Sequence, residues 1–253
     1  INVKMPVNYT TSTITSFDYA FSDCSNLKKF ILKGNLIKIA SMDGAFCYSP
    51  LRKLELPTTI SGCSNYYRLL WGALLTDLKL WEIDTVCYCP NAFRNMPYVT
   101  EIVFPESWNG KINELGGGFA NDYSLRKLIL PSTVHSSFSS SSFQELCYNC
   151  QKLPTVTLPA VQTVMTTFFR SFTNCSKLRA INNMQPFNSV ANLGNAFDNC
   201  VVLSTLNNTD QLGDTTTGVD LTSGYAGCYS LNPAGGLRVR NKITGRFVLA
   251  GID

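Results

Sequence analysis

Apolar and polar positions alternate along the chain in one short pattern that recurs many times. A small residue and an aromatic residue are followed by two residues, often a Cys, two more residues and then Leu, as in the stretch from Ala20-Phe21 through Cys24 to Leu27. Each copy then ends in two apolar residues separated by one other residue, commonly followed by Pro. This ending predicts a short strand with one buried face. The Pro lacks an amide hydrogen and ends the strand.

The copies follow one another at nearly constant intervals. The aromatic residue or its equivalent falls at positions 21, 46, 69, 93, 119, 147, 172, 197 and 225, which gives steps of 23 to 28 residues. A period in the twenties with a Leu-x-Leu core is typical of leucine-rich repeats. Because one copy cannot bury its apolar face alone, the copies must stack and share one continuous core. We therefore predict a repeat solenoid of about nine coils, each of 23–28 residues. The predicted solenoid has a parallel β-sheet on one face, is mostly β and loop with short helical turns, and aligns its aromatic residues in a column.

The order Ala-Phe-x-x-Cys-x-x-Leu-x-x-Leu-x-Leu-Pro resembles the BspA-like, or Treponema-type, leucine-rich repeat family. The resemblance is clearest at residues 92–105, 118–131 and 146–159 and covers roughly residues 17–235. It implies a surface-exposed or secreted protein that adheres to host proteins or other cells and is not an enzyme. Two copies depart from the pattern at Asn182-Asn183 and Asn207-Asn208, which predicts a ladder of stacked Asn side chains there.

The pattern divides the chain into three expected parts. Residues 1–19 form an N-terminal partial repeat or cap, residues 20–235 form the leucine-rich repeat solenoid, and residues 236–253 form a C-terminal β-hairpin cap. Val3-x-Met5-Pro6 is similar to the strand half of a repeat, so we expect that the start of the array is missing. Residues 237–240 and 246–249 predict the two strands of the hairpin. They lie on either side of the expected turn, Asn241 to Gly245.

Composition and charge exclude several classes of protein. Hydrophobic residues make up 45% of the 253 residues, which excludes global disorder, and only 15% are charged. The formal net charge of +4 is too small to indicate a nucleic-acid partner. No apolar run approaches the roughly 18 residues that span a bilayer, so we expect no membrane insertion. There is no signal segment in this chain, but the family resemblance favours an extracellular location, on a cell surface or a virion surface.

Cysteine and histidine offer little chemistry. Five of the ten Cys residues share one repeat position, which predicts a repeated buried environment in which free thiols pack as small apolar groups: Cys24, Cys150, Cys175, Cys200 and Cys228. The pairs Cys147–Cys150 and Cys87–Cys89 have spacings that zinc sites use, but Cys147 stands at an aromatic position of the repeat. His135 is the single histidine and follows a turn. We expect no catalytic residues, no metal and no cofactor.

The outward side of the predicted strands is the best candidate binding surface. Its residues are basic toward the start, mixed in the middle and rich in Thr later, and the candidates are Lys29, Ile31, Lys53, Glu55, Lys79, Glu101, Val103, Lys127, Ile129 and Thr157. Exposed apolar residues on such a face favour a protein or glycan partner. The alternative is a face that is merely solvated. The serine-rich insertion at residues 136–143 is expected to be a solvated turn.

Three functions follow, in decreasing order. The first is a non-enzymatic leucine-rich repeat binding module that recognises a protein or glycan on a cell surface, with an adhesin or receptor-binding role on a bacterium or virus particle. The second is a structural or decoration component of an assembly such as a virion or tail fibre, which forms a homo-oligomer or larger assembly through the terminal hairpin or the open coil edges. An enzyme is the least favoured, retained because insertions can add chemistry to any scaffold.

Overall fold

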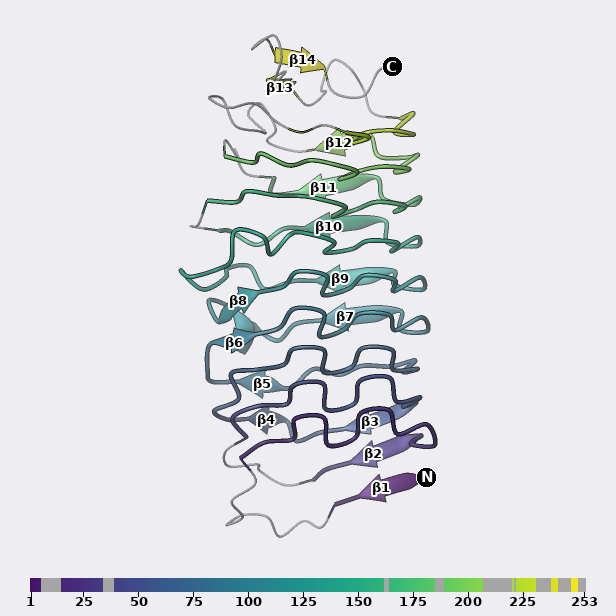
Figure 1. Ribbon diagram of the computed structural model, residues 1–253, viewed down its shortest axis with the longest axis vertical. Helices are drawn as coiled ribbons and strands as arrows, with labels where there is room; N and C mark the ends of the chain where they lie inside the picture. The colour runs from purple at the N-terminus through teal and green to yellow at the C-terminus, as the bar shows by residue number, and fades with distance from the viewer. Residues whose placement is uncertain are drawn as a thin grey trace.

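The computed structural model describes residues 1–5, 15–33, 39–161, 164–184, 189–206, 220, 222–230, 238–240 and 247–249. Most of these residues form flat turns that stack one on another from the N-terminus toward the C-terminus (Figure 1). The described part of the chain contains no α-helix and one short 3-10 helix, η1 (Glu106–Trp108). The predicted solenoid is therefore confirmed, but its expected short helical turns are reduced to η1.

Two columns of short strands run up the stack, as Figure 1 shows. The first column occupies the Leu-x-Leu segments and comprises β1 (Asn2–Lys4), β2 (Lys29–Ile31), β3 (Lys53–Glu55), β7 (Glu101–Val103), β9 (Lys127–Ile129), β10 (Thr155–Thr157), β11 (Ala180–Asn182) and β12 (Thr205–Leu206). The second column comprises β4 (Thr59–Ile60), β5 (Glu82–Ile83), β6 (Cys87–Tyr88) and β8 (Ile112–Glu114). All pairs within these columns are parallel. The parallel sheet predicted on one face is thus confirmed.

The register of the first column keeps the apolar side chains in line. Val3 pairs with Phe30 and Phe30 with Leu54, while Ile102 pairs with Leu128. Because side chains alternate between the two faces of a strand, these middle residues point into the core and their neighbours point outward. Phe30, Ile102 and Leu128 are all buried.

One residue in each turn occupies the aromatic position, and we call these nine residues the plug column: Phe21, Phe46, Leu70, Phe93, Phe119, Cys147, Phe172, Phe197 and Tyr225. All of them are buried except Phe21, which is partly buried. From Phe21 to Phe197, the backbone N–H of each plug donates to the carbonyl just before the next plug. Neighbouring rings stack, with centroids 5.9 Å apart for Phe93–Phe119 and 5.8 Å for Phe172–Phe197. The predicted column is confirmed, with one correction: Leu70, not residue 69, holds the plug position of its turn.

Each plug lies between two residues in the left-handed backbone region. The residues two before and two after every plug have positive φ, for example Asn91 (φ 55°) and Asn95 (φ 59°) around Phe93. Asn and Gly adopt this conformation at little cost, which explains why they recur at these positions. The paired left-handed residues turn the chain inward and back out again, so the plug reaches the core.

Fewer complete turns are present than the nine predicted copies. Seven turns in the described part of the chain combine a plug with a following strand of the first column, namely those that end in β2, β3, β7, β9, β10, β11 and β12. The Leu70 turn has no strand at this place. The residues that follow Tyr225 and Cys228 in the last copy, from 231 to 237, lie outside the described residues.

In five turns a Cys lies three residues after the plug, and we call these residues the thiol column: Cys24, Cys150, Cys175, Cys200 and Cys228. The thiols of Cys150, Cys175 and Cys200 each donate to a plug carbonyl one turn earlier in the stack. The acceptors are Phe119, Cys147 and Phe172, each at 3.0 Å. Ser49 makes the same bond with its hydroxyl, to the carbonyl of Phe21. All ten cysteines are free, and all but Cys24 are buried. Each thiol thus adds a second hydrogen bond to a carbonyl group that already accepts a backbone N–H within its own turn.

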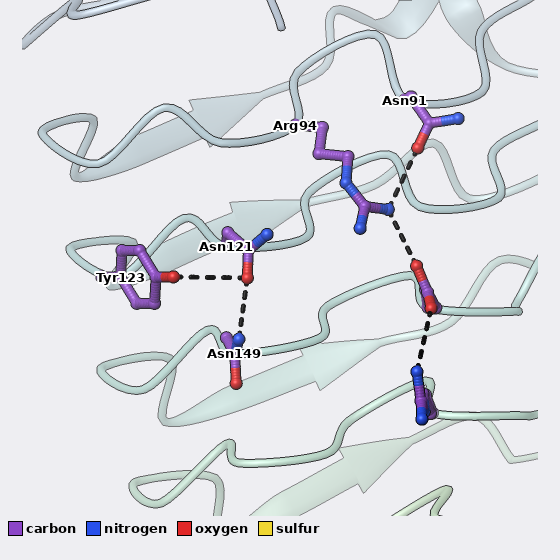
Figure 2. Close-up of polar contacts among 7 residues, drawn as sticks. Asn91, Arg94, Asn121, Tyr123 and Asn149 are labelled. Carbon is purple, nitrogen blue, oxygen red and sulfur yellow. Dashed lines mark hydrogen bonds and ion pairs between the residues drawn. The ribbon is translucent and has the colours of Figure 1, made fainter. Parts of the chain in front are cut away.

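A ladder of Asn side chains runs along the left-handed positions two residues after four successive plugs, and Figure 2 shows its first pair, Asn121 and Asn149. The Asn149 amide donates to Asn121 Oδ1 at 2.7 Å, Asn174 donates to Asn149 at 2.8 Å, and Asn199 donates to Asn174 at 3.0 Å. Toward the preceding turn, Asn182 bonds to Thr157 and Asn183 bonds to the Leu158 carbonyl, and the ladder expected between Asn182-Asn183 and Asn207-Asn208 stays a prediction. Asn207 and Asn208 lie outside the described residues.

The ladder gives a stability prediction. Asn149→Ala is expected to destabilise the protein by about 2 kcal/mol. It removes two ladder bonds, and it places an Ala at φ 62°, in the left-handed region that Ala adopts less readily than Asn or Gly. Asn149→Gly keeps the backbone freedom and loses only the two bonds, so its cost should be smaller. Urea unfolding of both variants measures the difference. Equal losses would show that the backbone conformation contributes nothing.

The ends and the serine-rich insertion complete the fold. β1 pairs with β2, so the strand expected near Val3 is present. β13 (Arg238–Arg240) and β14 (Phe247–Leu249) pair antiparallel, as expected of a hairpin, and their role as a cap stays a prediction. The insertion at 136–143 is not only a solvated turn, because Phe138 and Phe143 are buried and their ring centroids lie 5.7 Å apart.

Candidate functional site

The outward positions of the first strand column, with the matching residues 76–80 of the Leu70 turn, form a strip that we call the ribbon. Nine of the ten predicted site residues are exposed or half-buried on it: Lys29, Lys53, Glu55, Lys79, Glu101, Val103, Lys127, Ile129 and Thr157. Ile31 is the exception, and its prediction as an exposed residue is wrong. It is 9% exposed, since it lies in register between Lys4 and Glu55, whose longer side chains stand on both sides of it.

Two ion pairs lie on the ribbon. Lys53 Nζ is 2.8 Å from Glu55 Oε1 on the same strand, and Lys127 pairs with Glu101 across β9 and β7. The hydrogen bond from Lys53, with further attraction from Lys33 and Lys29, lowers the pKa of the Glu55 carboxyl. Exposed ion pairs of this kind add little to stability. They do fix where charge is presented on the surface.

The ribbon is interrupted at the Leu70 turn. Residues 76–80 carry the Leu-x-Leu pattern but form no strand, and no backbone hydrogen bond joins them to β3 or β7. The stack continues just beyond, where β4 pairs with β5. The interruption is therefore local to the ribbon face of this one turn.

A buried tryptophan accounts for the interruption. Trp81 stands where Pro57 and Pro105 end the neighbouring strands, and it is 2% exposed. Its indole N–H donates to the Tyr66 hydroxyl at 3.1 Å, and its carbonyl accepts from the Trp108 indole at 2.7 Å. Burying so large a ring draws this part of the turn inward, because aromatic rings of this size contribute strongly to a core.

A hollow of about 490 Å³ lies beside the interruption, between residues 76–82 and β7. Three predicted site residues line it, Lys79, Glu101 and Val103. Asp77 and Glu82 line it as well, and both are exposed. Ile129, 45% exposed, stands next to Val103 in the register of β7 and β9. The structure thus brings the central part of the predicted site together and leaves Lys29 and Thr157 several turns away.

The edge of β7 that borders the hollow has open backbone groups. Thr100 O accepts from Arg126 N, and Phe104 N donates to Ile129 O, so Thr100, Ile102 and Phe104 direct their backbone groups toward β9. Because these directions alternate along a strand, the N–H and C=O groups of Glu101 and Val103 face the hollow. An unpaired strand edge is a ready template for another strand.

A second, narrower interruption separates β9 from β10. These strands belong to different sheets, although Ala160 N still bonds to Ser132 O just beyond them. Pro154 occupies the position before β10 that Arg126 occupies before β9. The Arg126 N–H donates to Thr100 O of the preceding turn, whereas Pro154 has no N–H to donate. β7 and β9 therefore form a separate pair in the middle of the ribbon.

The remaining candidate chemistry is structural. His135 is half-buried, and its Nδ1 lies 2.7 Å from the Ser137 hydroxyl within the same turn. Burial raises the pKa of the Cys89, Cys147 and Cys200 thiols, which makes them poor nucleophiles. No group of three or more His, Cys, Asp or Glu side chains in the described residues could hold a metal ion. Among these residues, too, no helix is long and apolar enough to cross a membrane.

The prediction from sequence missed a second hollow, on the wall that carries the plug segments. It is lined by Tyr88, Asn91, Arg94, Glu114, Gln144 and Glu145, among other residues. The one signal in the sequence is Tyr88. Equivalent positions in other turns hold Ser41, Asn65 and Asn192. The side-chain oxygen of each of these residues accepts a hydrogen bond from the backbone N–H two residues later.

Comparisons with known proteins agree with this geometry. The family model described as "BspA type Leucine rich repeat region" matches residues 3–68 and 89–218 in six copies. The gap from 69 to 88 contains the Leu70 turn, where the ribbon is interrupted. The search of curated proteins found no match to this chain.

Several solved structures are similar. A leucine-rich cell surface protein from Faecalibacterium prausnitzii is 16% identical with a TM-score of 0.33, and the match covers 75% of this chain and 68% of that one. The Treponema pallidum leucine-rich repeat protein is 20% identical with a TM-score of 0.32, covering 93% of this chain and 79% of that one. A leucine-rich repeat protein from Eubacterium ventriosum is 16% identical with a TM-score of 0.33, covering 91% and 77%.

The family assignment follows from the repeat itself. The matched residues make up well over half of the chain, and they contain seven of the nine plugs and the ribbon strands from β2 to β12. The chain belongs to the BspA-type leucine-rich repeat family.

Proposed function

We propose that this protein is a non-enzymatic surface recognition module that binds an extended segment of a partner protein at the middle of its ribbon. Membership of a leucine-rich repeat family supports a protein-binding or surface-associated role. The observation that carries the finer proposal is the open edge of β7, where the backbone groups of Glu101 and Val103 face the hollow. An adhesin or receptor-binding role outside the cell would use this edge.

Backbone pairing would supply much of the affinity. A bound segment that runs along β7 can bond to two N–H and two C=O groups, as in other cases where a peptide adds a strand to a sheet. Its side chains would alternate between the hollow and the solvent. The Leu70 turn leaves room for such a segment because residues 76–80 do not occupy the ladder.

Side chains around the hollow favour a particular partner chemistry. Val103 is 36% exposed and Ile129 is 45% exposed, so together they offer apolar contact area on the ribbon. The charge of Glu101 is neutralised by Lys127. The other charged residues that line the hollow are Asp77 and Glu82, which are negative, and Lys79, which is positive. We therefore expect an extended segment that combines an apolar residue with a basic one. The mild negative charge would steer a basic segment and weaken its binding as salt rises.

The open edge makes a prediction about stability. Val103→Pro is expected to unfold at nearly the wild-type urea concentration, because the N–H that it removes faces the hollow and has no backbone partner among the described residues. Ile129→Pro removes an N–H that faces β7 and should destabilise by roughly 1–3 kcal/mol. Urea unfolding of the two variants measures this. Equal losses would mean that the edge of β7 is not open.

The proposed binding can be tested with a displayed library of random peptides selected on the full chain. Selected peptides should lose about tenfold or more in affinity toward Val103→Pro, which keeps the fold. Along a bound peptide, every second N–H group faces β7. N-methylation of those residues should abolish binding, and N-methylation of the residues between them should not. The matched control is Thr157→Pro, on a distant ribbon strand. Binding that Val103→Pro leaves intact, or a library without any selected binder, would contradict the proposal.

A further inference from the structure

The second hollow lies on the wall of the plug segments, away from the ribbon, and spans three consecutive turns. Its volume is about 270 Å³, which is below the range for drug-sized ligands and suits one small ring. Tyr88, Asn91 and Arg94 come from the Phe93 turn, Glu114 from the Phe119 turn, and Gln144 and Glu145 from the Cys147 turn. Its lining is almost entirely polar.

Glycine keeps this hollow open. Gly117 has φ 65° and lies at the left-handed position of the middle turn. A Cβ at this residue would collide with Asn91 Oδ1 and would lie 2.8 Å from Arg94 Nη1. The close approach of the backbone to these two side chains fixes the floor of the hollow.

Arg94 organises the polar groups, as Figure 2 shows. Its Nη1 donates to Asn91 Oδ1 at 3.1 Å and to Glu145 Oε2 at 2.9 Å. Its guanidinium also lies 5.2 Å from the ring centroid of Trp71, which holds it in place. Arg94 is 18% exposed, so its position is set by protein contacts and not by solvent. The site is therefore built before any ligand arrives.

Hydrogen-bonding capacity remains after these contacts. Glu114 Oε1 accepts from the N–H groups of Leu115 and Gly116, but within the described residues no hydrogen bond involves Glu114 Oε2. The same holds for the amide nitrogen of Asn91 and the exposed side-chain amide of Gln144. Donors and acceptors thus alternate around one small space. Hydroxyl groups, which both donate and accept, match such a set better than groups of one kind.

An aromatic ring stands at the rim. Tyr88 is 43% exposed and packs against Tyr67, with ring centroids 6.0 Å apart. In register it stands beside Glu114. Equivalent positions hold small polar residues such as Ser41 and Asn65, so the repeat itself does not require an aromatic ring here. An exposed ring beside a polar hollow offers one apolar face to a ligand that is otherwise hydrated.

We propose that this hollow is a binding site for one ring of a neutral saccharide. The apolar face of the sugar ring would stack on Tyr88, and its hydroxyl groups would bond to Asn91, Arg94, Glu114 and Gln144. A neutral ligand fits because Arg94 and Arg170 share Glu145, and Glu114 supplies a second negative charge, so the charges at this place balance. The carboxylates of Glu114 and Glu145 are not part of any group that could hold a metal ion among the described residues.

The test is binding of the full chain to an array of neutral oligosaccharides, followed by titration calorimetry of those retained. We expect Tyr88→Ala to lower the affinity by about tenfold or more and Tyr88→Phe to preserve it, since stacking needs the ring and not the hydroxyl. Gln144→Ala should weaken binding with no loss of stability, because its side chain is exposed. Tyr98→Ala is the matched control, an exposed Tyr (55%, against 43% for Tyr88) that does not line the hollow.

Several results would overturn the proposal. No retention of any neutral oligosaccharide would do so, as would binding that Tyr88→Ala and Tyr98→Ala reduce equally. Affinity that falls steeply between about 0.05 M and 0.5 M salt would point to a charged ligand instead. Val103→Pro leaves this wall unchanged, so loss of peptide binding on the ribbon and loss of saccharide binding here are distinguishable.

Discussion

Phe119→Ala is expected to destabilise the protein by about 3–5 kcal/mol, the range for removing a buried aromatic ring from a well-packed core. The ring is fully buried and stacks on Phe93 with an interplanar angle of 6°. It also meets the edge of Phe104, with centroids 6.1 Å apart. Because plugs from consecutive turns share these contacts, the cavity would weaken two interfaces between turns at once. Urea unfolding measures the loss.

The position of a plug in the stack should decide its contribution. Phe21 occupies the same repeat position near the first turn, but it is only partly buried. Phe21→Ala should therefore cost clearly less than Phe119→Ala. Amide exchange in the two turns that flank Phe119 should rise together in the variant, because the turns are stabilised by their neighbours. A larger loss for Phe21→Ala would contradict the shared-core account of this solenoid.

Asp122→Asn is expected to stabilise the protein at pH 7 by about 1–3 kcal/mol, because an ionisable carboxyl is costly to bury and an amide carries no charge. Asp122 is completely buried at a position where other turns carry Cys150 or Ser49. Its Oδ1 accepts from Met96 N at 2.7 Å, but Oδ2 has no partner in the described residues. An Asn side chain has the same shape, keeps the acceptor and carries no charge.

The effect of this substitution should depend on pH with a definite sign. Burial, followed by the neighbouring Cys150, raises the pKa of the Asp122 carboxyl well above its usual range, against smaller opposing effects of the Met96 N–H bond and of Arg94. Below about pH 4 the carboxyl is protonated in both folded and unfolded chains, so it causes no penalty. As pH rises, the unfolded chain ionises first, and the folded state of the wild type loses stability until its own pKa is reached.

Urea unfolding at pH 4 and pH 7 separates this linkage from other effects. The stability difference between Asp122→Asn and wild type should be small at pH 4 and larger at pH 7. Asp77→Asn, at an exposed carboxyl, is the control for the loss of one negative charge. A stabilisation that is the same at both pH values would mean that the Asp122 carboxyl ionises normally in the folded protein.

The candidate site was only partly predictable. The alternation of Lys127, Leu128 and Ile129 placed two of these residues on the ribbon correctly, because strand alternation depends on the local chain alone. Ile31 failed because its burial depends on the side chains of the neighbouring turns, which lie more than twenty residues away. The hollow on the ribbon depends on how Trp81 packs against Tyr66 and Trp108. The Leu-x-Leu pattern of residues 75–80 gave no sign of it.

The sequence by itself determined the repeat, its period, the parallel sheet and the column of plugs. Each of these follows from apolar spacing within one copy and from the need of every copy to bury the same face. Only the tertiary structure decided where the stack is irregular: the open edge of β7, the Asn ladder at Asn121 to Asn199 and the polar hollow beside Tyr88. Those features arise between turns, from contacts whose partners are set by stacking and not by neighbours in the chain.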